Sequence, residues 1–237
     1  MRGMGNAASP IAANLAAIRE RIERAAGRAK RRPEEITLVG ISKGVSAERI
    51  REAFTAGVRH MGESRVQEWE SKAAHLEDLD ATWHLVGHLQ RNKTTRAVSL
   101  FHTVDSLDTL PLAERLDRAA GEGRRLPVLV EVRLDPSGAK SGCLPEELPR
   151  LAEGMLLLPH LEWRGLMTVP AAPLHPEHSR PAFRRLRELR DELARRLDWL
   201  LPELSMGMSG DFEVAIEEGA TQIRVGTAIF GARAMEK

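Results

Sequence analysis

Eight short strand-like segments alternate with helix-like segments along this chain of 237 residues. The strand-like segments are apolar and rich in β-branched residues, and they lie near residues 36–43, 58–63, 82–88, 100–105, 127–133, 162–169, 203–208 and 222–226. Parallel strands need crossover helices between them, and an eighth strand closes such a sheet on itself. We therefore predict an α/β fold, a single TIM-type (β/α)8 barrel, with a doubly wound open sheet as the main alternative.

The segments between the strands have the spacing of amphipathic helices. Ser46 begins one that carries Ile50 and that Gly57 ends, and Ser64-Arg-Val-Gln67 has the capping-box pattern that begins the next. Further helices are expected near residues 108–120, 145–156 and 180–199, and a short one is expected between the last two strands.

One more helix is expected before the first strand, over residues 7–30. Ser9 and Pro10 suit the N-cap and the first helical position. Its apolar face is formed by Ile11, Leu15, Ile18 and Ile22. We expect this helix to dock on the barrel, so that residues 1–237 form a single domain.

Charge and composition exclude several classes of protein. The chain has 35 Lys and Arg residues against 34 Asp and Glu, a formal net charge of +1, so we expect no nucleic-acid binding. The single cysteine, Cys143, rules out an intrachain disulfide, and no apolar run approaches the roughly 20 residues that a membrane helix needs. These features favour a cytoplasmic protein without membrane attachment, and we expect a monomer.

The histidines and the cysteine do not predict a metal or a nucleophile. His84 and His88 are four residues apart on a strand, which separates them by roughly 13 Å, too far to share one ion. His175 and His178 have helical ligand spacing but belong to a polar loop that contains Pro176. We therefore predict no metal site, and we expect Cys143 to pack rather than react.

Two turns near the C-terminus carry groups suited to binding a phosphate. Ser209 follows the seventh strand, and Gly226 and Thr227 follow the eighth. Hydroxyls and backbone N–H groups of adjacent turns can converge on one dianion, and barrels commonly bind phosphate with the loops after these two strands. We refer to Ser209, Gly226 and Thr227 as the phosphate cup.

The first strand, Ile36-Thr-Leu-Val-Gly-Ile-Ser-Lys43, is nearly uncharged and ends in a lysine. A buried lysine loses hydration, which lowers its pKa and supplies the neutral amine that attacks an aldehyde. A lysine that faces a phosphate site predicts a phosphorylated aldehyde as the ligand, with pyridoxal 5′-phosphate (PLP) as the leading candidate. A sugar phosphate bound for Schiff-base aldol chemistry is an alternative.

Several longer motifs occur in a fixed order. They are Val39-Gly-Ile-Ser-Lys43, Gly62-Glu-Ser-Arg-Val-Gln-Glu68, Trp83-His-Leu-Val-Gly-His-Leu-Gln-Arg-Asn-Lys93, His102-Thr-Val-Asp-Ser106, Lys140-Ser-Gly142, Gly165-Leu-Met-Thr168, Met206-Gly-Met-Ser209 and Arg224-Val-Gly-Thr-Ala-Ile-Phe-Gly231. With these motifs the chain resembles the pyridoxal phosphate homeostasis protein family, which is related to the N-terminal barrel of bacterial alanine racemase. The resemblance covers the chain from about Ile36 to Arg233.

The resemblance implies that PLP is held as an aldimine of Lys43, with the phosphate cup on its phosphate and Arg224 near the pyridine nitrogen. It also implies a role in buffering or delivering PLP inside the cell, with PLP-dependent apoenzymes as recipients. Two positions depart from the family pattern. Ser64 stands near the cofactor where Asn is usual, and Gly44-Val45 replaces the common Thr-Lys, which removes a second positive side chain.

An enzyme of the same barrel type, an amino-acid racemase or decarboxylase, is the alternative. Racemisation needs a proton-transfer group on each face of the substrate, and the racemase relatives use a tyrosine opposite the lysine. This chain has no tyrosine, and it ends soon after the phosphate cup, so no second domain is expected. An arginine at the ring nitrogen also opposes the protonation that carbanion chemistry favours. These features favour a PLP-binding protein that is not an enzyme.

Overall fold

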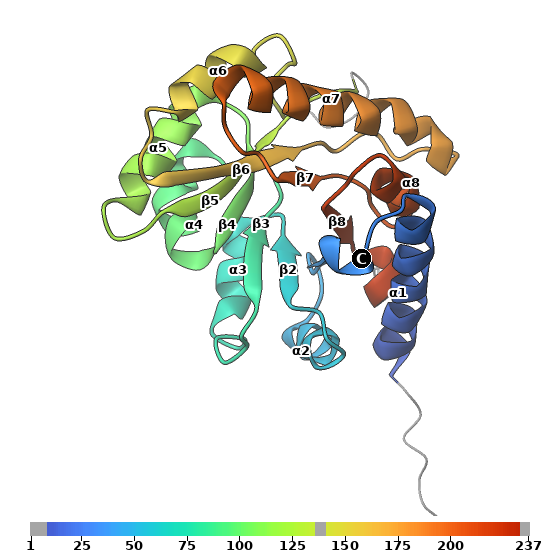
Figure 1. The fold of residues 1–237 in the computed structure, drawn as a ribbon. Coiled ribbons are helices and arrows are strands. Elements are labelled where there is room, and N and C mark those ends of the chain that lie inside the picture. Colours follow the sequence, from blue (N-terminus) through green and yellow to red (C-terminus); the bar gives the residue numbers. More distant parts are fainter. Residues whose placement is uncertain (1–8, 136–140, 233–237) are drawn as a thin grey trace, which may run out of the picture.

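Eight parallel strands form one closed barrel in the computed structural model, which describes residues 9–135 and 141–232 (Figure 1). The strands are β1 (Thr37–Ile41), β2 (His60–Glu63), β3 (Thr82–Leu85), β4 (Thr103–Leu107), β5 (Leu126–Glu131), β6 (Leu161–Met167), β7 (Glu203–Ser205) and β8 (Gln222–Val225). Neighbours pair in chain order, and β8 returns to pair with β1. The closed sheet confirms the predicted TIM-type barrel.

Helices surround the barrel and connect its strands (Figure 1). They are α1 (Pro10–Arg28), α2 (Ala47–Thr55), α3 (Val66–Ala73), α4 (Thr94–Leu100), α5 (Leu110–Ala120), α6 (Leu148–Met155), α7 (Arg180–Leu197), α8 (Phe212–Glu217) and α9 (Thr227–Phe230). Three short 3-10 helices are η1 (Pro33–Glu35), η2 (Arg91–Lys93) and η3 (Pro176–Ser179).

Helix α1, drawn in dark blue in Figure 1, packs against α8 and α9. The N–H of Ile11 donates to the hydroxyl of Ser9 (3.2 Å), Pro10 is the first helical residue, and the predicted apolar face is buried. The helix is shorter than the expected range 7–30. It ends at Arg28, since Lys30 has a left-handed φ of 55°, and residues 7 and 8 lie outside the described residues.

Two sequence expectations around α3 and α4 are wrong. Ser64 does not cap α3: Arg65 is still extended and occupies the N-cap position without a side-chain capping bond. The fourth strand begins at Thr103 rather than near residue 100, because Leu100 is the last residue of α4, a helix that the sequence pattern did not reveal.

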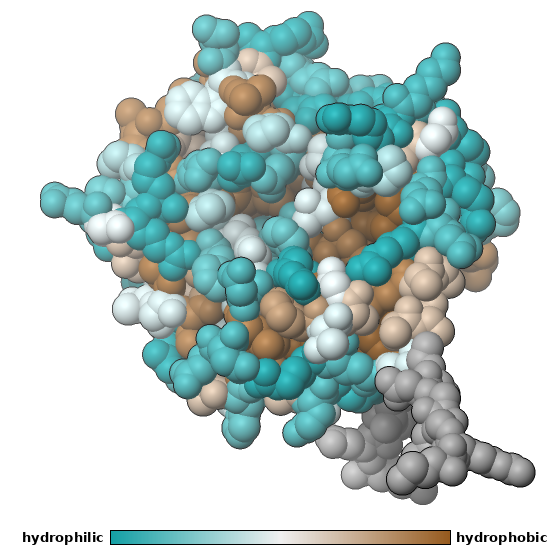
Figure 2. Space-filling view, turned by 60° about the horizontal axis from the view of Figure 1, so that its bottom comes forward, coloured by the Kyte–Doolittle hydropathy of each residue, from teal (hydrophilic) through white to brown (hydrophobic). Residues whose placement is uncertain are grey.

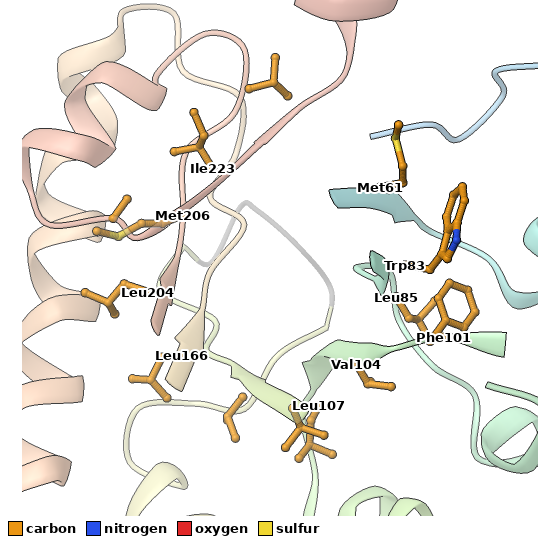
Figure 3. Packing of buried hydrophobic residues seen from close by; sticks show 14 of the residues in the cluster. Met61, Trp83, Leu85, Phe101, Val104, Leu107, Leu166, Leu204, Met206 and Ile223 are labelled. Atoms are coloured by element: carbon orange, nitrogen blue, oxygen red, sulfur yellow. The ribbon is translucent and has the colours of Figure 1, made fainter. Parts of the chain in front are cut away.

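A hydrophobic layer lies between the barrel strands and the helices (Figure 3). Trp69 of α3 stacks on Trp83 of β3 with ring centroids 3.7 Å apart, and Phe101 lies next to them. Along β8, Ile223 belongs to this layer, whereas Gln222 and Arg224 alternate with it and are buried inside the barrel. The barrel interior is therefore partly polar.

The face in Figure 2 is mostly hydrophilic, with hydrophobic areas between the hydrophilic ones. On α7, Arg180, Arg184 and Arg187 form ion pairs with Glu218, which follows α8 and is buried. Within the described part of the chain, none of the helices combines the length and the apolar character needed to cross a bilayer.

Candidate functional site

A cavity of about 900 Å³ opens at the carboxyl ends of the strands, the end at which TIM-type barrels carry their active sites. Its lining includes five of the six residues predicted to bind a cofactor: Lys43, Ser209, Arg224, Gly226 and Thr227. They meet because barrel closure pairs β1 with β8. Ser64 follows β2, is half-buried, and does not line this cavity, so its role stays a prediction.

Lys43 lies in a turn just after β1, and two glutamates fix this turn on either side of it. The buried hydroxyl of Ser42 donates to Oε1 of Glu63 (2.8 Å), and the N–H of Gly44 donates to Oε1 of Glu68 (2.5 Å). Gly44 has a φ of +70°, a conformation that glycine adopts at little cost. The departure from the family pattern at Gly44 thus fits a backbone requirement of the turn.

Lys72 of α3 joins the two glutamates and lines the same cavity, and sequence reasoning missed it. Its ammonium group lies 2.8 Å from Oε1 of Glu63 and 3.1 Å from Oε1 of Glu68, and it donates to the carbonyl of Ser42 (3.2 Å). Lys72 therefore adds a second lysine to the lining of the cavity, paired with the two glutamates. The i,i+4 pair of Glu68 and Lys72 was visible in the sequence, but such pairs usually lie on solvated faces.

Burial acts on both glutamates. It raises the pKa of the Glu63 carboxyl, although Lys72 and Ser42 oppose it, and Oε2 of Glu63 has no hydrogen-bond partner among the described residues. Burial also acts to raise the pKa of Glu68. The N–H of Gly44 and the ammonium of Lys72 outweigh this effect and hold the pKa of Glu68 below its ordinary value. Glu68 is therefore held in its ionised form, in which it fixes Lys72 and the turn.

The phosphate cup is assembled from the turn after β7 and the first turn of α9. The hydroxyl of Ser209 accepts a hydrogen bond from the N–H of Ala228 (3.3 Å), which ties the two turns together. Gly226 precedes α9, and a Cβ at this position would lie 3.3 Å from the side chain and carbonyl of Ile41. Thr227 is exposed and Ser209 is half-buried, so a ligand can reach both hydroxyls.

Arg224 lies at the base of the cavity and is 4% exposed. Its guanidinium donates to the hydroxyl of Ser205 (2.6 Å) and to the carbonyl of Thr168 (2.8 Å). Burial lowers the pKa of Arg224, while the carboxylates of Asp105, Glu131 and Asp211 oppose this shift. The side chain is thus held in one orientation and keeps a donor role, because arginine does not deprotonate in proteins.

Among the described residues that line the cavity, basic groups outnumber acidic ones. Its lining contains Lys43, Arg49, Lys72 and Arg224 against Glu68 and Asp211. Asp211 is already engaged, because it accepts hydrogen bonds from the N–H of Met208 (2.7 Å) and the hydroxyl of Ser179 (2.7 Å). The surplus of positive charge suits a dianionic ligand.

The described residues contain no cluster of three or more His, Cys, Asp or Glu side chains that could hold a metal ion. Cys143 is buried, and burial raises the pKa of its thiol to about 12, so it is not a nucleophile at neutral pH. In the motif Lys140-Ser-Gly142, Lys140 lies outside the described residues.

Comparison with known proteins gives a consistent picture. Residues 13–234 match the family model of the alanine racemase N-terminal domain. The pyridoxal phosphate homeostasis protein of Aquifex aeolicus is 46% identical over 92% of this chain and 96% of its own. That of Pseudomonas aeruginosa is 45% identical over 95% of this chain and 96% of its own. PipY of Synechococcus elongatus, solved with PLP bound, is 42% identical with a TM-score of 0.80, covering 93% of this chain and all of that one.

Proposed function

Since the chain belongs to the pyridoxal phosphate homeostasis proteins, within the alanine racemase N-terminal domain family, we propose that it binds PLP in the cavity at the carboxyl ends of its strands. One observation carries this proposal: Lys43, Arg224 and the phosphate cup, which come from opposite ends of the sequence, line one cavity. We further propose that the barrel and α1 act as one cofactor-binding unit.

The groups present fit PLP. The cavity offers a primary amine for an aldehyde, a fixed guanidinium for a ring nitrogen, and two hydroxyls with nearby cations for a phosphate. Its volume of about 900 Å³ is within the usual range for small-molecule sites. When bound, PLP supplies an aldehyde that amines capture reversibly and a ring that withdraws electrons.

Lys43 is the proposed point of covalent attachment. Its amine adds to the aldehyde carbon, the aldehyde oxygen leaves as water with the two amine protons, and a C=N bond joins Nζ to that carbon. Addition of water or of another amine reverses the attachment and releases the ligand. Glu63 and Glu68 hold the turn that carries Lys43, so they position this amine.

The proposed site retains and releases PLP rather than catalysing turnover. Arg224 presents a permanent positive charge at the ring nitrogen, which opposes protonation there and weakens the ring as an electron sink. The chain has no tyrosine to move a proton on the face opposite Lys43. Both features favour retention and release of PLP over turnover, and the proposed recipients of the released PLP are PLP-dependent apoenzymes.

A transfer experiment tests this role. The PLP-loaded protein is mixed with an apoenzyme that needs PLP, in the presence of a phosphatase that destroys free PLP. We expect the apoenzyme to become active although free PLP is removed, and Lys43→Ala to give no activation. If the phosphatase abolishes activation by the wild type, PLP passes only through solution and direct delivery is wrong.

A further inference from the structure

A row of polar side chains, all buried except the half-buried His60, crosses the inside of the barrel beneath Arg224. It consists of His60, His84, Asp105, Gln222 and Ser205, which come from β2, β3, β4, β8 and β7. Nδ1 of His60 lies 3.0 Å from Nε2 of His84, and Nδ1 of His84 lies 2.9 Å from Oδ2 of Asp105. Polar side chains occupy these positions where TIM-type barrels usually place bulky apolar ones.

Gln222 connects this row to Arg224. Its amide nitrogen donates to Oδ2 of Asp105 (2.7 Å) and to the hydroxyl of Ser205 (2.9 Å). The same hydroxyl accepts from Arg224 (2.6 Å). Gln222 and Arg224 are two residues apart on one strand and both point inward, so the row ends at the base of the cofactor cavity.

The opposite end of the row opens to a second cavity, of about 560 Å³, at the amino ends of the strands. His60, His84 and Gln222 are among the residues that line it. The hydrogen-bonded row therefore spans the barrel between its two openings, while Asp105 in its middle is only 1% exposed.

The carboxylate of Asp105 accepts hydrogen bonds from three side chains. Burial alone would raise the pKa of its carboxyl, but His84, Thr103 and Gln222 donate to it and hold that pKa below its ordinary value. Arg224, in contrast, carries a buried positive charge whose two hydrogen-bond acceptors among the described residues, Ser205 and Thr168, are neutral. A buried charge needs compensation, and Gln222 lies between the two ions.

We propose that Gln222 is a positioning residue: it links the Asp105 carboxylate to Ser205 and thereby holds the Arg224 guanidinium in the orientation that meets the cofactor ring. Gln222 does not touch the ligand in this account. The orientation of Arg224 is a property of the protein alone, whereas its consequence for PLP rests on the proposed function.

The first test needs no PLP. Hydrogen exchange of the Arg224 guanidinium N–H groups is measured by 15N NMR, with the signals assigned through Arg224→Lys. We expect Gln222→Met, which keeps the length of the side chain but removes its donor, to speed this exchange about tenfold or more, because the Ser205 hydroxyl loses its second anchor. Ser106→Ala is the matched control, since it removes another buried hydroxyl whose bond to the carbonyl of Gly87 (2.7 Å) is outside the row.

Unchanged exchange in Gln222→Met, or an equal increase in Ser106→Ala, would overturn the proposal. If Gln222→Met does not fold, Gln222→Leu removes the same amide donor and must give the same acceleration, since the direct bond from Arg224 to Ser205 is left in place.

The second test uses PLP. Gln222→Met is expected to shift the absorption band of bound PLP. It should also weaken the binding of PLP and of pyridoxal by the same factor, because Arg224 faces the ring rather than the phosphate. An unshifted band with unchanged affinities would also overturn the proposal. Failure of the wild type itself to bind PLP would contradict the proposed function, and the exchange measurement would then decide the role of Gln222.

Discussion

The ammonium group of Lys72 lies 2.8 Å from Oε1 of Glu63, a carboxyl that is fully buried under the turn that carries Lys43. The same ammonium group also contacts Glu68, which accepts the N–H of Gly44. A helix residue thus anchors the two glutamates that fix the reactive turn. Side chains of the protein alone therefore hold the turn that carries Lys43 in place.

Lys72→Met should destabilise the protein strongly. Removing one partner of a buried pair leaves an uncompensated group and costs about 3–5 kcal/mol. The free energy of unfolding in urea at neutral pH measures this loss. The double variant Glu63→Gln with Lys72→Met should recover most of it, because the buried charge is then gone. A loss below about 1 kcal/mol in the single variant would show that the pair contributes no more than a surface pair.

Ser209→Ala and Thr227→Val should weaken PLP binding but leave pyridoxal binding nearly unchanged, because pyridoxal lacks the phosphate. A hydrogen bond to a charged group contributes about 1.5–3 kcal/mol, which is roughly a factor of 10 to 150 in affinity. Titration of each variant with both ligands, followed by absorbance, measures the difference. Equal losses for the two ligands would mean that these hydroxyls support the fold and that the phosphate binds elsewhere.

Stability should fall as the pH is lowered from about 6.5 towards about 4, in part because of His60. Burial first, and then His84, lower the pKa of His60 from 6.5 to about 4 in the folded protein. Between these values the unfolded chain binds a proton at His60 that the folded chain does not, so acid favours unfolding. His102, whose pKa burial also lowers, acts in the same direction.

His60→Gln should therefore reduce the slope of the unfolding free energy against pH between about 4 and about 6.5. Some slope should remain, because other groups also titrate there. The measurement is a series of urea unfolding curves between pH 4 and pH 8. Superimposable slopes for the wild type and the variant would show that His60 titrates alike in both states.

The PLP-loaded protein should not racemise free amino acids catalytically. Exchange with racemisation needs a proton-transfer group on both faces of the substrate, and the chain offers Lys43 on one face but no tyrosine for the other. Incubation with L-alanine in deuterated water, with NMR for exchange and chiral analysis for configuration, measures this directly. Sustained racemisation that disappears in Lys43→Ala would instead identify an enzyme.

The sequence predicted the barrel because each strand carries a local apolar signal that needs no partner to be recognised. It also placed Lys43 and the phosphate cup at strand ends, which barrel closure brings together, whereas the role of Arg224 came from the family resemblance. The predicted start of α3 was wrong because the capping pattern at Ser64 does not reveal that Arg65 remains extended. Such a boundary depends on how the turn packs, which local spacing does not encode.

The polar interior escaped sequence analysis for a different reason. Gln222 and Asp105 are 117 residues apart and come from opposite sides of the barrel. Each looks like an ordinary polar residue within its own strand, and only the closed sheet makes them partners. Lys72 was missed in the same way, because its contact with the carbonyl of Ser42 crosses 30 residues.

The central claim is that Lys43 carries PLP, and chemical trapping tests it most directly. The protein is incubated with PLP, its visible absorption is recorded, and borohydride is added before peptide mapping by mass spectrometry. We predict a visible band that is absent in Lys43→Ala, and a pyridoxyl group on the peptide that contains Lys43. Lys72, the other lysine among the described residues that line the cavity, is the internal comparison. Pyridoxyl found on Lys72 or on any other lysine, with Lys43 unmodified, would contradict the account.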